Sequence, residues 1–170
     1  ELCLKNGAID VLVADTKESQ ENIWEGRGCI IDAAKAEGIV ELMDAVVPRN
    51  QLPQFLDGLV SLSQKYGLKT QNFGHAGDGN VHTNVLKADL SDDQWNAKIQ
   101  GFSEELYALS LKLGGNISGE HGIGLLRKQF LVEALGETEE DGIIQLQLMK
   151  QIKKAFDPNN ILNPQKIFDL

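Results

Sequence analysis

Residues 68–86 read LKTQNFGHAGDGNVHTNVL, and this stretch decides the fold. It predicts two strands, residues 68–73 and 80–86, on either side of a glycine-rich turn. In the second strand, polar His82 and Asn84 alternate with apolar neighbours, and a strand places alternate side chains on opposite faces. The pattern therefore predicts a hairpin with one apolar face and one polar face.

Further strand and helix patterns lie before the hairpin. Compact apolar runs at residues 8–14 and 39–47 predict two strands. Thr16 predicts the start of a helix that runs through residue 37. Apolar residues at helical spacing predict a second helix, which ends at Tyr66 because Gly67 suits a left-handed cap.

Two longer helices follow the hairpin. Ser91 and Gln94 form a capping-box pattern that begins one of them, and Gly114 ends it. A short strand comes next, and Thr138 begins the last helix, which stops at Asp157 before a proline. The order of elements predicts an α+β fold, a ferredoxin-like sandwich in which an antiparallel sheet has helices packed on one face. Trp24 and Trp95 are expected in the core.

Composition limits the classes of function. The chain has 170 residues, enough for one domain with a buried core. Its 16 basic and 25 acidic residues give a formal net charge of -9, so nucleic acid is not an expected partner. Cys3 and Cys29 are too few for a disulfide framework. A cytoplasmic location is therefore expected, with peripheral membrane association as the open alternative.

The beginning of the chain, ELCLK, has the pattern of neither a signal peptide nor an initiation site. No apolar run approaches the roughly 20 residues that span a bilayer. We therefore expect the sequence to be a piece excised from a longer protein.

All three histidines lie in glycine-rich segments, GHAGDGNVH at residues 74–82 and GEHGIG at residues 119–124. Eight of the 17 glycines fall within residues 74–79 and 114–124. Glycine allows positive φ and close approach of another group, so these loops are expected to surround a ligand.

His75, His82 and Glu120 are the predicted metal ligands. Two imidazoles across a tight turn and a carboxylate from a distant loop make an open three-ligand site. Such a site suits Zn²⁺, with Mn²⁺, Fe²⁺ and Co²⁺ as alternatives. Asp78 between two glycines is interpreted as a turn residue. The competing interpretation is that both histidines are ordinary turn and strand residues held by backbone hydrogen bonds.

Three more residues are candidates for substrate chemistry. Glu120 and His121 are neighbours, and in an extended loop one would face a metal and the other a substrate. His121 is therefore a candidate general base. Asn84 shares a strand face with His82 and could bind the same ligand. Arg27 could hold a carboxylate in bidentate fashion, although a solvated surface arginine is the alternative.

Three motifs in this order, GHAGDGNVHTNV, SGEHGIG and FDPNNILNPQKIF, resemble the C-terminal domain of FAD-linked oxidases. This family includes D-lactate dehydrogenases, the glycolate oxidase flavin subunit and D-2-hydroxyglutarate dehydrogenase. The resemblance implies that residues 1–170 are the substrate-facing C-terminal domain. It also implies that the first part of this domain, and a whole domain that holds most of the FAD, lie outside the sequence.

The same resemblance implies roles for single residues. His75, His82 and Glu120 would bind the metal, and Arg27 would grip the substrate carboxylate. His121 would contact substrate and remove its hydroxyl proton. Asn84 would also touch substrate, and Asn163 would lie in a segment against the flavin.

The implied activity is oxidation of a small 2-hydroxy acid to a 2-oxo acid, with hydride transfer to FAD. The partners would be the FAD-binding domain and an electron acceptor such as a quinone, a cytochrome or an electron-transfer flavoprotein. Apolar Ile31 and Leu42 stand where dicarboxylate-specific relatives carry polar residues, which favours lactate or glycolate. No dinucleotide cradle occurs here, so the chain alone is expected to be inactive. The alternatives are a stand-alone metallohydrolase and a non-catalytic ferredoxin-like binding module.

Overall fold

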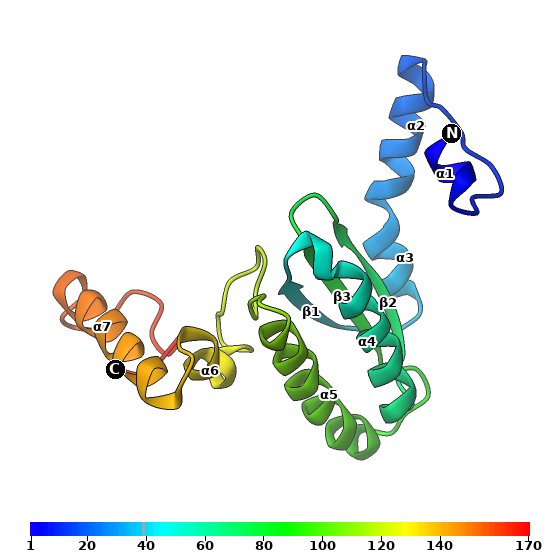
Figure 1. Cartoon of the computed structure of the whole chain (residues 1–170). Coiled ribbons are helices and arrows are strands. Elements are labelled where there is room, and N and C mark those ends of the chain that lie inside the picture. The colour runs from blue at the N-terminus through cyan, green and yellow to red at the C-terminus, as the bar shows by residue number, and fades with distance from the viewer. Residues whose placement is uncertain (39) are drawn as a thin grey trace. The chain divides into compact units, whose positions relative to one another are not determined.

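The computed structural model describes residues 1–38 and 40–170, which form two units. Unit 1 is Glu1–Gly38, and unit 2 is the remainder of the chain. Unit 1 consists of the helices α1 (Leu2–Lys5), α2 (Lys17–Gly28) and α3 (Ile30–Ala36), shown in blue in Figure 1. Unit 2 contains the sheet and the longer helices.

The strand predicted at residues 8–14 is wrong. This segment has no regular secondary structure, and Ile9 and Leu12 are 102% and 87% exposed. A strand is stable only where a neighbour pairs its backbone groups, and the described residues of unit 1 contain helices alone. The apolar run therefore lacks the partner that its composition requires.

The single helix predicted at residues 17–37 is also wrong, because Cys29 divides it into α2 and α3. Two glycines in the last turn of α2 weaken the helix where it breaks. The predicted start is confirmed, since Thr16 accepts a hydrogen bond from the Ser19 amide. Trp24 on α2 is 67% exposed and not part of a core.

The sheet has three antiparallel strands in the order β1-β3-β2. They are β1 (Val40–Val46), β2 (Lys69–His75) and β3 (Asn80–Leu86), which confirms the predicted hairpin. Asp44 pairs with His82, and His82 pairs with Phe73, so these three side chains lie in one row across the sheet. Residue 39, at the beginning of the predicted strand 39–47, lies outside the described residues.

The helices α4 (Leu52–Tyr66) and α5 (Asp92–Lys112) lie side by side against one face of this sheet (Figure 1). Trp95 packs against the resulting core, as predicted. The α+β sandwich is therefore confirmed. The fully buried core side chains from helices and sheet are Phe55, Leu59, Phe102, Leu106 and Val85.

The predicted start of α5 and the predicted end of α4 are confirmed. Ser91 and Gln94 form the capping box of α5, with the Gln94 amide donating to the Ser91 hydroxyl. Gly67 ends α4 with φ at 59°, a left-handed conformation that glycine adopts without strain. A short 3₁₀ helix, η1 (Arg49–Gln51), joins β1 to α4.

The short strand predicted after α5 is reduced to one isolated bridge, in which Asn116 pairs with Val46 at the outer edge of β1. The bridge places this segment where the fourth strand of a ferredoxin-like sheet would lie. The ladder does not continue, because the Ile117 amide donates to the Asn116 side chain and the amides of Gly119 to His121 donate to the Asp44 side chain. A carboxylate thus takes the place of a strand partner.

The C-terminal part contains η2 (Lys128–Phe130), α6 (Leu131–Leu135) and α7 (Glu139–Phe156). Thr138 caps α7 as predicted, by accepting from the Asp141 amide. Asp157 ends α7 and accepts from the amides of Ile161 and Leu162. The Lys153 ammonium and these amides lower the pKa of Asp157 to about 2. None of the helices in the described residues combines the length and hydropathy of a membrane span.

The turn between β2 and β3 offers a test of the fold. A Cβ atom on Gly79 would lie 1.9 Å from the Val47 carbonyl oxygen, and Gly79 has φ at +76°. We expect Gly79→Ala to lower the free energy of unfolding by about 3 kcal/mol through overpacking and left-handed strain. Urea unfolding measures this change. Gly77→Ala is the matched control, since a Cβ there meets nothing within 4 Å. Equal losses in the two variants would contradict the prediction.

Candidate active site

Polar side chains lie on the sheet face opposite α4 and α5. Asn80, His82 and Asn84 alternate along β3 with Val81 and Val85, which belong to the core. All three polar residues are buried, although they face away from the helices. Buried polar groups are stable only with hydrogen-bond partners or a ligand, so this face is a candidate site.

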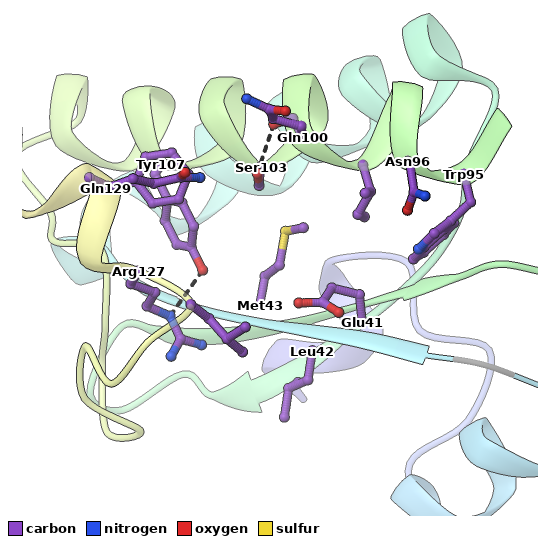
Figure 2. Close-up of a pocket in the computed structure, with 13 residues that line it drawn as sticks. Glu41, Leu42, Met43, Trp95, Asn96, Gln100, Ser103, Tyr107, Arg127 and Gln129 are labelled. Carbon is purple, nitrogen blue, oxygen red and sulfur yellow. Dashed lines mark hydrogen bonds between the residues drawn. The ribbon is translucent and has the colours of Figure 1, made fainter. Parts of the chain in front are cut away.

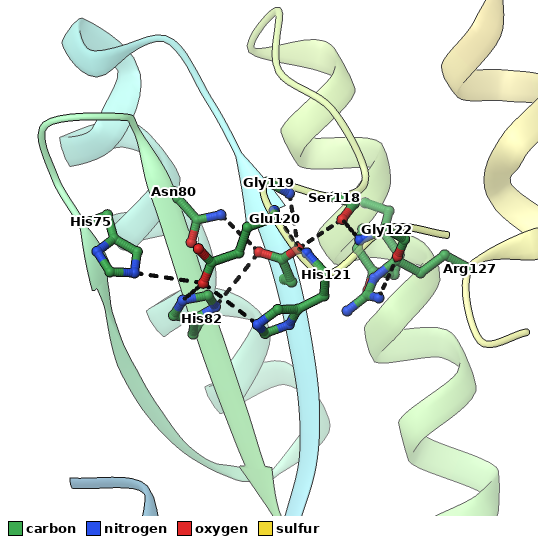
Figure 3. Close-up of polar contacts among 11 residues, drawn as sticks. His75, Asn80, His82, Ser118, Gly119, Glu120, His121, Gly122 and Arg127 are labelled. Atoms are coloured by element: carbon green, nitrogen blue, oxygen red, sulfur yellow. Dashed lines mark hydrogen bonds and ion pairs between the residues drawn. The ribbon is translucent and has the colours of Figure 1, made fainter. Parts of the chain in front are cut away.

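Asp44 is the centre of the hydrogen bonds on this face, and it is 0% exposed. Its Oδ2 atom accepts four hydrogen bonds from one loop (Figure 3). One carboxylate oxygen of Asp44, on β1, therefore holds the loop that carries Glu120 and His121. The four donors are the Ser118 hydroxyl at 2.8 Å and the amides of Gly119 at 2.9 Å, Glu120 at 3.1 Å and His121 at 3.0 Å.

The second oxygen of Asp44 faces β3. Oδ1 accepts from the Asn80 amide nitrogen at 2.8 Å and lies 3.6 Å from Nδ1 of His82. Burial alone would raise the pKa of Asp44, but the loop amides, the Ser118 hydroxyl and Asn80 hold it well below its ordinary value. Asp44 is therefore charged at neutral pH despite its burial.

Three imidazoles surround the Glu120 carboxylate. Its Oε1 atom lies 3.0 Å from Nε2 of His82, 3.5 Å from Nε2 of His121 and 3.6 Å from Nε2 of His75. The His82 and His121 rings are stacked, with centroids 4.9 Å apart, and His75 meets His82 edge-on at 5.6 Å. The structure thus brings together the three predicted metal ligands and the predicted base (Figure 3).

The donor set fits a divalent metal. Ligand atoms about 2.1 Å from one tetrahedral ion lie about 3.4 Å from one another, close to the separations around Glu120. His75, His82 and Glu120 form one possible group, and Asp44, His82 and His121 form a second that shares His82. Asp78 belongs to neither group, consistent with its interpretation as a turn residue.

His82 has the surroundings of a neutral ligand. Burial lowers the pKa of His82, against the attraction of the Asp44 carboxylate. A neutral imidazole keeps a lone pair for coordination. Its Nδ1 atom is buried and has no hydrogen-bond partner among residues 1–38 and 40–170, and only a small movement would let it donate to Asp44. Metal-binding histidines commonly donate their other nitrogen to a carboxylate in this way.

The expectation that Glu120 and His121 point in opposite directions is wrong, because their side chains meet at 3.5 Å. That expectation assumed that the loop at Glu120 and His121 is extended. The loop instead turns three successive amides, of Gly119, Glu120 and His121, toward one oxygen of Asp44. Neighbouring side chains then leave the curved backbone on the same side.

The other predicted site residues lie in three places. Asn84 is buried two residues along β3 from His82, and it pairs with Leu42 and Gln71. Arg27 lies in the exposed last turn of α2 in unit 1. Asn163 is exposed in the C-terminal tail with φ at 49°. This tail contacts the glycine-rich loop, since the Ile167 amide donates to the Gly124 carbonyl at 2.7 Å.

The sequence-based interpretation missed two residues that fix the ends of the loop. Asp44 is one of two carboxylates, with Glu41, in an otherwise apolar strand, and the sequence does not show which of them is buried or what it binds. Arg127 is 6% exposed and donates from Nη1 to the Gly122 carbonyl at 2.9 Å and from Nε to the Tyr107 hydroxyl at 3.0 Å. Nothing in the local sequence distinguishes Arg127 from a solvated arginine.

The role of Asp44 can be tested through stability. We expect Asp44→Asn to lower the free energy of unfolding by about 3 kcal/mol at neutral pH, because an amide cannot replace a charged acceptor for the loop donors. Urea unfolding measures the loss, and Asp57→Asn on an exposed turn of α4 is the control.

The same variant has a distinct pH dependence. A carboxylate with a depressed folded-state pKa stabilises the fold above its unfolded pKa and loses this effect as the pH falls. The stability difference between the unmodified chain and Asp44→Asn should therefore shrink below about pH 4. A difference that stays constant from neutral to acid pH would contradict the charged state of Asp44.

Comparisons with known proteins give the family. The family model for FAD linked oxidases, C-terminal domain, matches residues 1–167. A D-lactate dehydrogenase of Anaerostipes hadrus is 39% identical over 98% of this chain and 34% of its own length. A glycolate oxidase subunit of Bacillus subtilis is 35% identical over 98% of this chain and 34% of its own length.

A D-2-hydroxyglutarate dehydrogenase of Stutzerimonas stutzeri is 30% identical over 99% of this chain and 36% of its own length. The chain thus spans about a third of the length of the curated relatives that it matches. Since the family model covers nearly every residue, the chain belongs to the family of FAD linked oxidases, C-terminal domain.

Proposed function

We propose that this chain is the substrate-facing C-terminal domain of an FAD-dependent 2-hydroxy-acid dehydrogenase or oxidase that uses a divalent metal. The observation that carries the proposal is the convergence of three imidazoles on the Glu120 carboxylate. Family membership supports FAD as the cofactor. The relatives are about three times as long, which supports a separate domain of the same enzyme as the main FAD-binding part.

In this proposal, His75, His82 and Glu120 hold the metal, with Zn²⁺ favoured. A bound divalent ion would polarise the hydroxyl oxygen of the substrate and favour loss of its proton. His121 receives that proton, and its stacking on His82 supports a fixed orientation of the base. Asp44 supports the same geometry by holding the His121 amide.

The remaining assignments concern substrate and flavin. Arg27 binds the substrate carboxylate, Asn84 donates a hydrogen bond to substrate, and Asn163 lies against the flavin. Bound FAD would accept the hydride from carbon 2, so that loss of one proton and one hydride leaves a 2-oxo acid. The contact of the tail with the loop of His121 supports placing Asn163 near this site.

We propose a small monocarboxylate such as D-lactate or glycolate as the substrate. Leu42 pairs with Asn84 in the sheet, so an apolar side chain stands beside the proposed substrate contact. Burying a second carboxylate next to Leu42 would leave that charge without a partner. Ile31, the other apolar position, lies on α3. The electron acceptor in this proposal is a quinone, a cytochrome or an electron-transfer flavoprotein, and the location is cytoplasmic.

Metal binding provides the first test. We expect the chain to bind one Zn²⁺ or Co²⁺ with affinity that falls about a hundredfold or more in His82→Ala, because a ligand is lost. Titration calorimetry with Zn²⁺ and the visible absorption of Co²⁺ measure binding. Asp78→Asn, in the same turn but outside both donor groups, should bind normally. Failure of the unmodified chain to bind either ion would refute metal assistance.

Flavin reduction provides the second test. We expect the complete enzyme containing this chain to bleach its oxidised flavin when D-lactate is added without oxygen. His121→Ala should slow the bleaching by about 10²–10⁴-fold, because proton removal is lost. Stopped-flow absorbance measures the rate, with Asp57→Asn as the control. Unchanged rates in His121→Ala would remove this residue from the mechanism, and hydrolysis without flavin would favour a metallohydrolase instead.

A further inference from the structure

A cavity lies at the outer edge of β1, between this strand, α5 and residues 126–130. Its volume is about 400 Å³, enough for a small organic molecule. Figure 2 shows Arg127 and Tyr107 at one end and Trp95 and Asn96 at the other. The residues around it include neither the three histidines nor Glu120, so the cavity is separate from the metal-ligand cluster.

Arg127 gives this cavity a buried positive charge. Its side chain is fixed by two hydrogen bonds, from Nε to Tyr107 and from Nη1 to the Gly122 carbonyl. The remaining nitrogen, Nη2, has no protein partner among the described residues, and no carboxylate of that part lies within 4.0 Å of the guanidinium. Nη2 is not enclosed by the protein, so water reaches it, and an anionic ligand would replace that water beside the positive charge.

The rest of the lining is mixed. Gln100, Ser103 and Gln129 are polar, and apolar residues form one side that can hold a hydrophobic group. Trp95, Ile99 and Phe130 pack around the cavity as partly or fully buried hydrophobic residues. Met43 from β1 adds a flexible thioether, which adapts to ligands of different shape. A guanidinium at one end of a cavity that has an apolar side can bind a carboxylate attached to a hydrophobic group.

Glu41 also lines the cavity, toward the end occupied by Trp95 (Figure 2). It is half-exposed, so water screens its charge more than it screens the charge of Arg127. The charges at the two ends set the orientation of a ligand. Its carboxylate would lie at Arg127 and its apolar end toward Trp95.

We propose that this cavity is a binding site for a monocarboxylate with an apolar body, in which Nη2 of Arg127 is the anion donor. The site goes beyond the proposed oxidation, because it uses none of the metal-ligand residues. Arg127 also holds the Gly122 carbonyl in the loop of His121. An acid bound here therefore contacts a residue that fixes the catalytic loop.

Phenylacetate is the probe, and phenylacetamide is its neutral counterpart of nearly equal size. The chain has two tryptophans, so a Trp24→Phe background leaves Trp95 in the cavity as the only fluorophore of its kind. We expect saturable quenching or enhancement of Trp95 fluorescence by phenylacetate, with binding by phenylacetamide about tenfold weaker or worse. Equal responses to acid and amide, or no saturable response to the acid, would overturn the proposal.

Variants then test whether Arg127 supplies the positive charge that binds phenylacetate. Arg127→Gln should weaken phenylacetate binding about tenfold or more, and Arg127→Lys should give an intermediate loss because it keeps the charge without the planar fork. Lys128→Gln is the matched control, since Lys128 pairs with Asp169 and does not line the cavity. Glu41→Gln should bind at least as tightly as the unmodified chain.

Two results would count against a specific site. Equal losses in Arg127→Gln and Lys128→Gln would mean attraction by surface charge alone. Undiminished binding in a folded Arg127→Gln, checked by circular dichroism, would remove the donor. If Arg127→Gln does not fold, the comparison of phenylacetate with phenylacetamide decides the outcome, because it is made on the chain that keeps Arg127. Neither measurement uses flavin or metal, so the result is independent of the proposed oxidation.

Discussion

The site depends on one interaction, between the buried Asp44 carboxylate and the loop that carries Glu120 and His121. Three backbone amides and a hydroxyl donate to a single oxygen of this side chain. Such donors, all from one loop, stabilise the charged form of Asp44, and the carboxylate in turn fixes the loop conformation. The positions of Glu120 and His121 therefore follow from a residue about 75 positions earlier in the chain.

The glycines near the histidines serve this contact. A Cβ atom on Gly119 would lie 1.5 Å from the Asn80 side-chain nitrogen and 3.2 Å from Asp44 Oδ1, so only glycine allows the loop to approach β3. Gly122 and Gly124 have positive φ, which lets the backbone leave Asp44 and reach Arg127. A flexible segment is thus ordered by a carboxylate at one end and a guanidinium at the other.

Local patterns predicted most of the fold. The hairpin, the caps at Ser91 and Thr138, and the end at Gly67 depend on a few neighbouring residues, so the sequence contains the needed information. The convergence of His75 and His82 on Glu120 was predictable because histidine and glutamate in glycine-rich loops are chemically distinctive. Asp44 and Arg127 were not, since all the side-chain partners of Asp44 are distant in sequence and the Tyr107 partner of Arg127 lies on another element. The strand prediction for residues 8–14 was wrong for a related reason. A composition typical of strands does not supply the neighbouring strand that must pair with it.

The shortened fourth strand has a consequence for how this chain avoids unwanted association. With one bridge at Asn116, no further strand in the described part of the chain covers the outer edge of β1. Exposed backbone at a sheet edge is a template for strand addition and aggregation. Glu41 places a carboxylate on this edge, next to apolar Leu42 and Met43, where incoming strands would have to bury it. Met43, Asp44 and Ala45 are buried, so only the half-exposed beginning of the strand is accessible, and there the Glu41 carboxylate opposes the addition of another strand.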